Sequence, residues 1–206
     1  MSLTLDFSGD CTSDRGGITE LQANGTISVG ELQTCNALND FNITSSSNPP
    51  PIPAELDMAI VNFGNGDVSI RLGNGDGTFN STALDVPVGG RPQSIAVGFF
   101  NADSNLDLAV VNQAPNVVSI RLGNGDGTFN STAPNVGVGN VPISIAVGLF
   151  NADSNLDLAV ANDLDGDVSI RLGNGDGTFT LPNNSPPDVA VGTNPSSIAV
   201  GDFDNK

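Results

Sequence analysis

"SIRLGNGDGTF" occupies Ser69–Phe79 and returns unchanged at Ser119–Phe129 and Ser169–Phe179, at intervals of 50 residues. A second stretch, "FNADSNLDLAV", occurs at Phe100–Val110 and again at Phe150–Val160. Self-similarity at a fixed period is typical of repeat proteins, in which one supersecondary unit buries its apolar faces by packing against its neighbours. The repeat therefore predicts the architecture more directly than any other feature of the chain.

Each repeat contains the pattern of four short strands, because β-branched and alanine residues cluster between turn residues. "GNGDG" is a turn signal, since Asn-Gly and Asp-Gly tolerate positive φ. The expected strands are, in order, "SIAVG", "LDLAV" or a close variant, "VSIRLG", and the irregular run after "GTF". First strands are expected at 94–98, 144–148 and 197–201, second strands from Leu56, Leu106 and Leu156, third strands from Val68, Val118 and Val168, and fourth strands ending near Val88, Val138 and Val191.

Four antiparallel strands in about 40–50 residues make one blade of a β-propeller. The expected fold class is therefore all-β, with propeller-type four-stranded antiparallel blades repeated every 50 residues and a small N-terminal β segment. A β-solenoid is the second candidate, although its coils are usually shorter. We expect an N-terminal β-rich segment at 1–48 with a hairpin around Asn24-Gly25, a Pro-rich linker at 49–55, and three blades at 56–206.

The first and last repeats are incomplete in a complementary way. No "SIAVG" precedes Leu56, whereas "SSIAVGDF" at Ser196–Phe203 is a first strand with no blade after it. An unpaired strand edge is a template for another chain. We expect the C-terminal strand of one subunit to complete the first blade of the next, head to tail, giving a ring or a filament. The alternative is a fragment of a larger adhesin whose missing blades lie downstream of Lys206.

Composition excludes several classes of function. The 206 residues include 23 acidic and 6 basic side chains and no His, Trp or Tyr, with a net charge of -17. Such a surface repels nucleic acid and anionic membranes and attracts metal cations. No apolar run could span a bilayer, and no signal peptide is visible, so an exported protein would have lost it. Cys11 and Cys35 favour a disulfide, with two buried thiols as the alternative.

The loop "FNADSNLDL" joins the first and second strands and carries oxygen side chains at alternate positions. Such side chains converge on one point in a tight loop, as in the first part of an EF-hand loop, and Ca²⁺ prefers oxygen ligands. The alternative is a polar turn held by bonds from Asn and Asp side chains to the backbone. The candidate ligands are Asn101, Asp103, Asn105 and Asp107 in one repeat, Asn151, Asp153, Asn155 and Asp157 in the next, and Asp6, Ser8, Asp10 and Asp14 near the N-terminus.

The combined pattern "VGFFNADSNLDLAVVN…VSIRLGNGDGTF" resembles the FG-GAP/VCBS repeat of integrin-like β-propellers and many secreted bacterial proteins. The resemblance covers about Leu56 to Asp204 and implies propeller blades with calcium loops of the form Asp-x-Asn/Asp-x-Asp-Gly-x-x-Asp. The chain departs from this form at position 1, which is Phe99 or Leu149, and at position 6, which is Ser104 or Ser154. The resemblance therefore implies weak Ca²⁺ binding, with the polar turn still open.

Other polar residues have simpler interpretations. Asp163, Asp165 and Asp167 could hold a cation or form an ordinary hairpin turn, and the repeated "GNGDG" aspartates (Asp76, Asp126 and Asp176) are expected in turns. The repeated arginines are expected to pair with carboxylates or pack between blades: Arg71, Arg121 and Arg171. Five asparagines begin glycosylation sequons, whose use depends on the source: Asn24, Asn42, Asn80, Asn130 and Asn183.

These features together predict an extracellular or cell-surface, non-enzymatic, calcium-binding scaffold for adhesion, coating or assembly. Its expected partners are further copies of the chain, and surface glycans or proteins. The alternative is a glycan-binding propeller lectin, but sugar sites usually present aromatic platforms and the chain has no Trp or Tyr. An enzyme is disfavoured because the sequence has no His, no nucleophile-elbow motif and no carboxylate pair distinguishable from the turns.

Overall fold

The alternation of apolar residues and turn signals produces strands throughout the computed structural model, which describes residues 18–21, 27–29, 55–80, 84–182 and 188–204. These residues form strands, turns and loops without a helix, so none of them forms a helix that could cross a membrane. The chain divides into two units, 1–53 and 54–206. The division falls inside the predicted linker 49–55.

The first unit is described only at its hairpin. β1 (Ile18–Leu21) pairs antiparallel with β2 (Ile27–Val29), as the sequence predicts. The two cysteines and the candidate ligands of this unit lie outside the described residues, so the disulfide and the N-terminal calcium site stay predictions: Cys11, Cys35, Asp6, Ser8, Asp10 and Asp14.

The second unit begins with a three-stranded antiparallel sheet. Its order is β3 (Met58–Asn62), β4 (Asp67–Arg71) and β5 (Leu84–Pro87). These are the second, third and fourth strands of the predicted repeat. Among the described residues, β3 pairs only with β4. The first strand is therefore absent from this blade, as the sequence predicts, and the outer side of β3 has no strand beside it.

The second sheet contains the full repeat. β6 (Pro92–Gly98), β7 (Asp107–Asn112), β8 (Val117–Gly123) and β10 (Val136–Gly137) lie side by side in chain order. The short β9 (Phe129–Asn130) pairs with the far end of β8, after the "GNGDG" turn. Consecutive strands are antiparallel, which is the order of a propeller blade and not of a solenoid coil.

The third sheet repeats this arrangement. β11 (Pro142–Gly148), β12 (Asp157–Asn162), β13 (Asp167–Gly173) and β15 (Asp188–Ala190) are its four main strands, and β14 (Phe179–Thr180) pairs with the end of β13. The register is also repeated, because the same sequence positions oppose one another in all three sheets: Met58↔Arg71, Leu108↔Arg121 and Leu158↔Arg171. The all-β, repeated-blade fold is confirmed.

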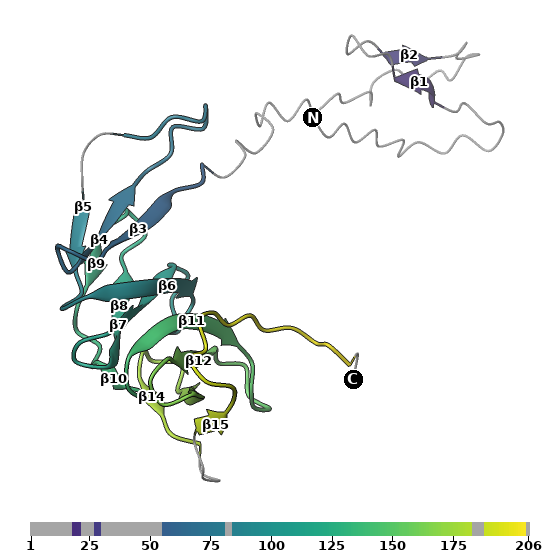
Figure 1. Cartoon of the computed structure of the whole chain (residues 1–206). Helices are drawn as coiled ribbons and strands as arrows, with labels where there is room; N and C mark the ends of the chain where they lie inside the picture. Colours follow the sequence, from purple (N-terminus) through teal and green to yellow (C-terminus); the bar gives the residue numbers. More distant parts are fainter. Residues whose placement is uncertain (1–17, 22–26, 30–54, 81–83, 183–187, 205–206) are drawn as a thin grey trace. The chain divides into compact units, whose positions relative to one another are not determined.

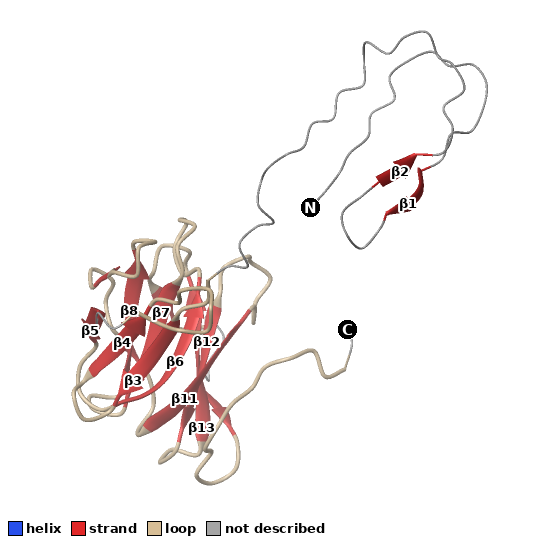
Figure 2. Ribbon diagram, turned by 90° about the horizontal axis from the view of Figure 1, so that it is seen from above, coloured by secondary structure: helices blue, strands red, loops and turns tan. Residues whose placement is uncertain are grey.

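The core lies between the sheets, which follow one another as layers (Figures 1 and 2). Every residue of β7 is buried, since alternate side chains face opposite neighbours. Leu108 and Val110 pack with Val68 and Ile70 of the first sheet. On the other face of β7, Ala109 and Val111 pack with Leu158 and Val160 of the third sheet. Val118 and Ile120 of β8 complete this second interface, which lies between the second and third sheets.

The chain after β15 differs from the prediction. A first strand is expected at 197–201, but residues 191–204 contain no strand. The corresponding strands β6 and β11 pair with the strand that follows each of them. No described residue after Gly201 forms a second strand with which residues 197–201 could pair. The segment therefore has the sequence of a first strand but does not belong to a sheet. It stays near the third sheet, where the Ile198 amide donates to the Ser144 hydroxyl at 3.3 Å.

Replacing Ile120 with alanine should lower the free energy of unfolding by about 3 kcal/mol, because this fully buried side chain fills the second interface between sheets. Urea unfolding followed by circular dichroism measures the effect. Leu164 is the matched control, since it is 69% exposed in the β12–β13 turn. Its alanine variant should differ from the parent by less than about 0.5 kcal/mol; equal losses in both variants would contradict a core between the sheets.

Candidate functional site

The candidate calcium loop of the second blade connects β6 to β7 and is closed by its own side chains. Asn101 Oδ1 accepts the Asp103 amide at 3.0 Å, and Asp103 Oδ1 accepts the Asn105 amide at 2.8 Å. Asp103 Oδ2 also accepts a hydrogen bond from Asn101 Nδ2 at 2.8 Å. The two bonds from backbone amides are Asx-type bonds, in which a side chain accepts from the amide two residues on. The structure thus brings three of the four predicted ligands together.

The loop of the third blade, between β11 and β12, has the same bonds. Asn151 Oδ1 accepts the Asp153 amide at 2.9 Å, and Asp153 Oδ1 accepts the Asn155 amide at 2.8 Å. Asn151 Nδ2 again donates to Asp153 Oδ2, at 2.9 Å. Identical local sequence therefore gives identical local geometry in both loops.

The fourth predicted ligand, Asp107, has a different environment. Its side chain is fully buried, and its two oxygens accept the Phe100 amide at 2.8 Å and the Gly123 amide at 2.9 Å. The carboxylate therefore fastens the start of the loop to the end of β8. Desolvation is the main cause that raises the pKa of Asp107, and the nearby Asp103 carboxylate adds to the rise. Hydrogen bonds from the Gly123, Phe100 and Asn101 amides act against it.

The other blades repeat this fastening. Asp157 is also fully buried and accepts the Phe150 amide at 2.7 Å and the Gly173 amide at 2.9 Å. In the first blade, Asp57 accepts the Gly73 amide at 2.9 Å. The aspartate of "LD" is thus a structural acceptor in all three blades.

The "GNGDG" turn lies against the loop. Asn105 Oδ1 is so close to Gly125 that a Cβ there would stand 2.5 Å from it, and Gly125 has φ of 83°. The positive φ favours glycine at this position, and a Cβ there would displace the Asn105 side chain. Asn155 and Gly175 repeat the contact in the third blade. Loop and turn therefore form one packed end of each blade.

The aspartates of these turns are engaged locally. Asp126 accepts the Thr128 amide at 2.9 Å and also the Thr128 hydroxyl. The hydroxyl bond, followed by the amide bond, lowers the pKa of Asp126. The same pair of bonds lowers the pKa of Asp76 and of Asp176. The prediction that these residues belong to turns is confirmed.

The acidic β12–β13 hairpin also resolves into separate contacts. Asp165 accepts the Asn140 amide at 2.6 Å and the Asn140 side chain at 3.0 Å, and these bonds lower its pKa. Asp167 accepts from Asn162 at 2.7 Å, and Asp163 accepts from Asn194 at 3.1 Å. Three aspartates with three different partners form a hairpin turn rather than one ligand set.

The fit of Ca²⁺ to these loops depends on the oxygens that remain free to coordinate. Ca²⁺ takes about six to eight oxygen ligands. Each loop offers one exposed carboxylate, Asp103 or Asp153, and its oxygens already accept hydrogen bonds. No group of three or more acidic, His or Cys side chains that could hold a metal lies within the described residues. A bound ion would therefore have to replace bonds that now close the loop, and calcium binding stays a prediction.

The repeated arginines join neighbouring blades. Arg121 Nε donates to the Pro87 carbonyl of the first sheet at 2.9 Å, and Arg171 Nε donates to the Gly137 carbonyl of the second sheet at 2.8 Å. Arg171 also pairs with Asp188 at 3.3 Å. The prediction that these side chains pair with carboxylates or pack between blades is confirmed for Arg121 and Arg171, whereas Arg71 donates to the carbonyl of its neighbour Ile70. The main partner is a backbone carbonyl, which the sequence could not identify.

Sequence reasoning missed a second contact between blades. The Ser119 hydroxyl donates to the Val88 carbonyl at 2.8 Å and accepts from Asn112 Nδ2 at 2.9 Å. In the third blade, Ser169 accepts the Gly139 amide at 3.1 Å. The repeated Ser of "VSIRLG" is the only signal for this contact, and it does not distinguish an outward polar face from a buried bond. Of the sequon asparagines, Asn80 and Asn130 are described and half-buried, whereas Asn24, Asn42 and Asn183 are not described.

Comparison with known proteins supports the repeat. A sequence model described as an FG-GAP-like repeat matches residues 150–205. That stretch contains "FNADSNLDLAV" and "SIRLGNGDGTF", which the second blade carries unchanged. No curated protein and no solved structure matches the chain significantly.

Replacing Asp107 with asparagine should lower the free energy of unfolding by about 1–3 kcal/mol, because the amide leaves one buried backbone N–H without an acceptor. Urea unfolding in EDTA measures this loss without any contribution from calcium. The control is Asp103→Asn on the same loop, which is exposed and should cost less than about 1 kcal/mol. If Asp107→Asn matches the parent in EDTA, the structural assignment of this carboxylate is wrong.

Proposed function

We propose, from the premise that the chain is an FG-GAP-like repeat protein, that it is an extracellular, non-enzymatic scaffold that associates head to tail with further copies of itself. One observation carries the proposal. The outer side of β3 has no strand beside it among the described residues, and residues 197–201 have the sequence of the strand that belongs there.

The register of this contact follows from the complete blades. In the second blade, β6 pairs with β7 through Ile95↔Val110 and Gly98↔Asp107. The third blade has the same register, Ile145↔Val160 and Gly148↔Asp157. Transfer of this register to two copies places Ile198 opposite Ile60 and Gly201 opposite Asp57. Strand addition of this kind supplies main-chain hydrogen bonds that neither edge makes alone.

The extracellular assignment rests on the likeness to FG-GAP repeats, and the charge of the chain limits its partners. A net charge of -17 keeps nucleic acid and anionic lipid away from the surface. The same charge makes copies repel one another, so association should strengthen when salt screens the surface. The apolar side chains along the proposed contact provide the attraction.

Calcium enters the proposal as a weak ligand of the two loops. Its carboxylate ligands would be Asp103 and Asp153, with amide oxygens from Asn101 and Asn151. Asp107 and Asp157 would support the loops from behind, because their oxygens hold backbone amides.

Deleting residues 196–206 should convert the assembled protein to monomers, because the deletion removes the strand that would complete β3 of the next copy. Sedimentation velocity of the parent and the truncated chain, over a range of concentrations, measures the change. Circular dichroism should show that the truncated chain keeps its strands. A truncated chain that assembles like the parent would contradict strand addition, and a parent that is monomeric throughout would contradict self-association itself.

Ca²⁺ should raise the melting temperature of the parent by a few degrees or less, about 1 kcal/mol of stabilisation, because each loop has an incomplete ligand set. The double variant Asp103→Asn, Asp153→Asn should lose this shift while it melts close to the parent in EDTA. Asp126→Asn, on the adjacent turn, is the control and should keep the shift. A parent whose melting temperature ignores both Ca²⁺ and EDTA would show that the loops are turns only.

A further inference from the structure

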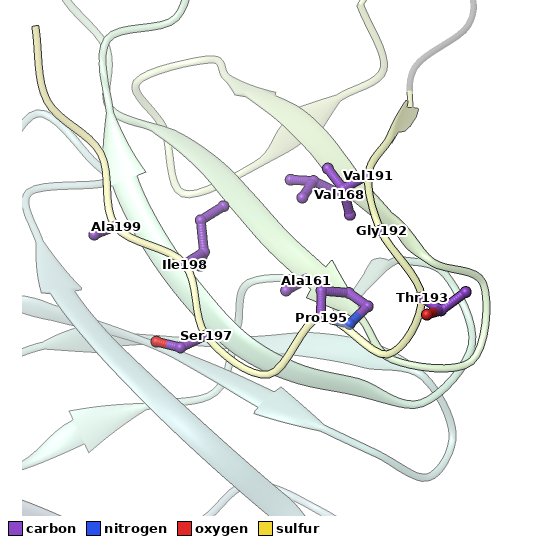
Figure 3. Close-up of a pocket in the computed structure, with 9 residues that line it drawn as sticks. All are labelled: Ala161, Val168, Val191, Gly192, Thr193, Pro195, Ser197, Ile198 and Ala199. Atoms are coloured by element: carbon purple, nitrogen blue, oxygen red, sulfur yellow. The ribbon is translucent and has the colours of Figure 1, made fainter. Parts of the chain in front are cut away.

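An apolar groove lies on the face of the third sheet that points away from the second sheet. Its volume is about 400 Å³. β12 and β13 form its floor with Ala161 and Val168, and the segment after β15 forms its wall with Val191, Pro195 and Ile198 (Figure 3). Val168 is only half-buried, whereas the equivalent Val68 and Val118 are fully buried.

The same groove exists twice more in the chain, and there it is filled. Ala161, Val168 and Val191 correspond to Val61, Val68 and Val88 of the first blade, and Ile198 corresponds to Ile95 of β6, the first strand of the blade that follows. These four side chains pack with Leu108 and Val110, which come from the second strand of the next blade. At the next interface, Val111, Val118 and Val138 of the second blade and Ile145 of β11 pack with Leu158 and Val160 in the same way.

The side chains that would fill the third groove are exposed at the other end of the row of blades. Met58 and Ile60 are the first-blade equivalents of Leu108 and Val110. Each is 40% exposed, whereas Leu108 is 2% exposed and Val110 is fully buried. The third blade thus has a groove that no described side chains fill, and the first blade has exposed side chains of the kind that fill such a groove.

We propose that Met58 and Ile60 of a second copy occupy the groove lined by Ala161, Val168, Val191 and Ile198. This inference rests on the proposed head-to-tail association and names the side chains that drive it. The occupant is a second copy because this chain's own β3 carries apolar residues, in the same register, at the two positions that fill the equivalent groove at both interfaces inside the chain.

A polar contact accompanies the apolar one. Arg121 and Arg171 each donate Nε to a carbonyl of the preceding blade, from Pro87 and Gly137. Among the described residues, Arg71 donates only through Nη1, to its neighbour Ile70. Ala190 occupies the position of Pro87 and Gly137 in the third blade. The contact therefore places Arg71 Nε of one copy at the Ala190 carbonyl of the other.

The test uses two full-length variants that each damage one side of the contact. Ile60→Glu puts a charge on the filling side, and Val168→Glu puts a charge in the groove. Each variant alone should associate about 100-fold or more weakly than the parent, because an unpaired carboxylate would be buried. An equimolar mixture should form heterodimers and nothing larger, since each variant keeps one intact side. Sedimentation velocity distinguishes these states.

The control is Leu164→Glu, which adds the same charge to an exposed leucine in the β12–β13 turn and should assemble like the parent. Circular dichroism checks that each variant is folded. If Val168→Glu does not fold, Ile60→Glu mixed with the parent takes its place, because its intact groove should cap growing assemblies and shorten them. Arg71→Met should weaken association without changing the melting temperature of the monomer.

The outcomes separate the inference from the proposed function. The inference is overturned if folded Ile60→Glu and Val168→Glu assemble like the parent, if their mixture stays monomeric, or if Leu164→Glu is equally damaged. In the first case, loss of assembly on deletion of residues 196–206 would still support strand addition through the backbone alone. A parent that is monomeric throughout would overturn both.

Discussion

Apolar contact between neighbouring blades is the constraint on which the rest of this structure depends. A single blade has a middle strand that is apolar on both faces, so it cannot shield both faces by folding alone. β7 meets the constraint completely, since Leu108 and Val110 pack against the first sheet while Ala109 and Val111 pack against the third. The outer blades meet it on one side only. The proposed association follows from this asymmetry.

Hydrogen bonds between neighbouring blades define their relative position more closely than apolar contacts alone. Arg121 and Arg171 each donate to a carbonyl of the preceding blade, and Ser119 adds a second bond to the first blade. These donors satisfy backbone carbonyls at the sheet edge, where an unpaired group would cost free energy. Because donors and acceptors recur at the same sequence positions, successive blades can form the same hydrogen bonds with each other. The repeat therefore encodes a self-complementary surface as well as a strand pattern.

The acidic loops show how a motif can contribute structure through residues that look like ligands. Asp107 and Asp157 use both carboxylate oxygens to hold backbone amides across the blade. Asn101 and Asp103 close the loop with bonds to amides two residues on. These oxygens thus hold the turn through hydrogen bonds to the backbone, and the exposed carboxylates of Asp103 and Asp153 are the groups that Ca²⁺ would have to recruit.

The sequence by itself determined the strands, their antiparallel order and the blade as the repeating unit, because period, strand alternation and Gly-rich turns are local properties. It also indicated that the repeated arginines pair with carboxylates or pack between blades, as Arg121 and Arg171 do. Only the tertiary structure decided which backbone amides donate to Asp107 and which carbonyls accept from Arg121 and Arg171. It also showed that residues 197–201 do not pair with a described strand. The groove beside Val168 was also beyond the sequence, because it arises from positions far apart in the chain. Local patterns specify what each segment can form, whereas burial and partners depend on what the neighbouring blade supplies.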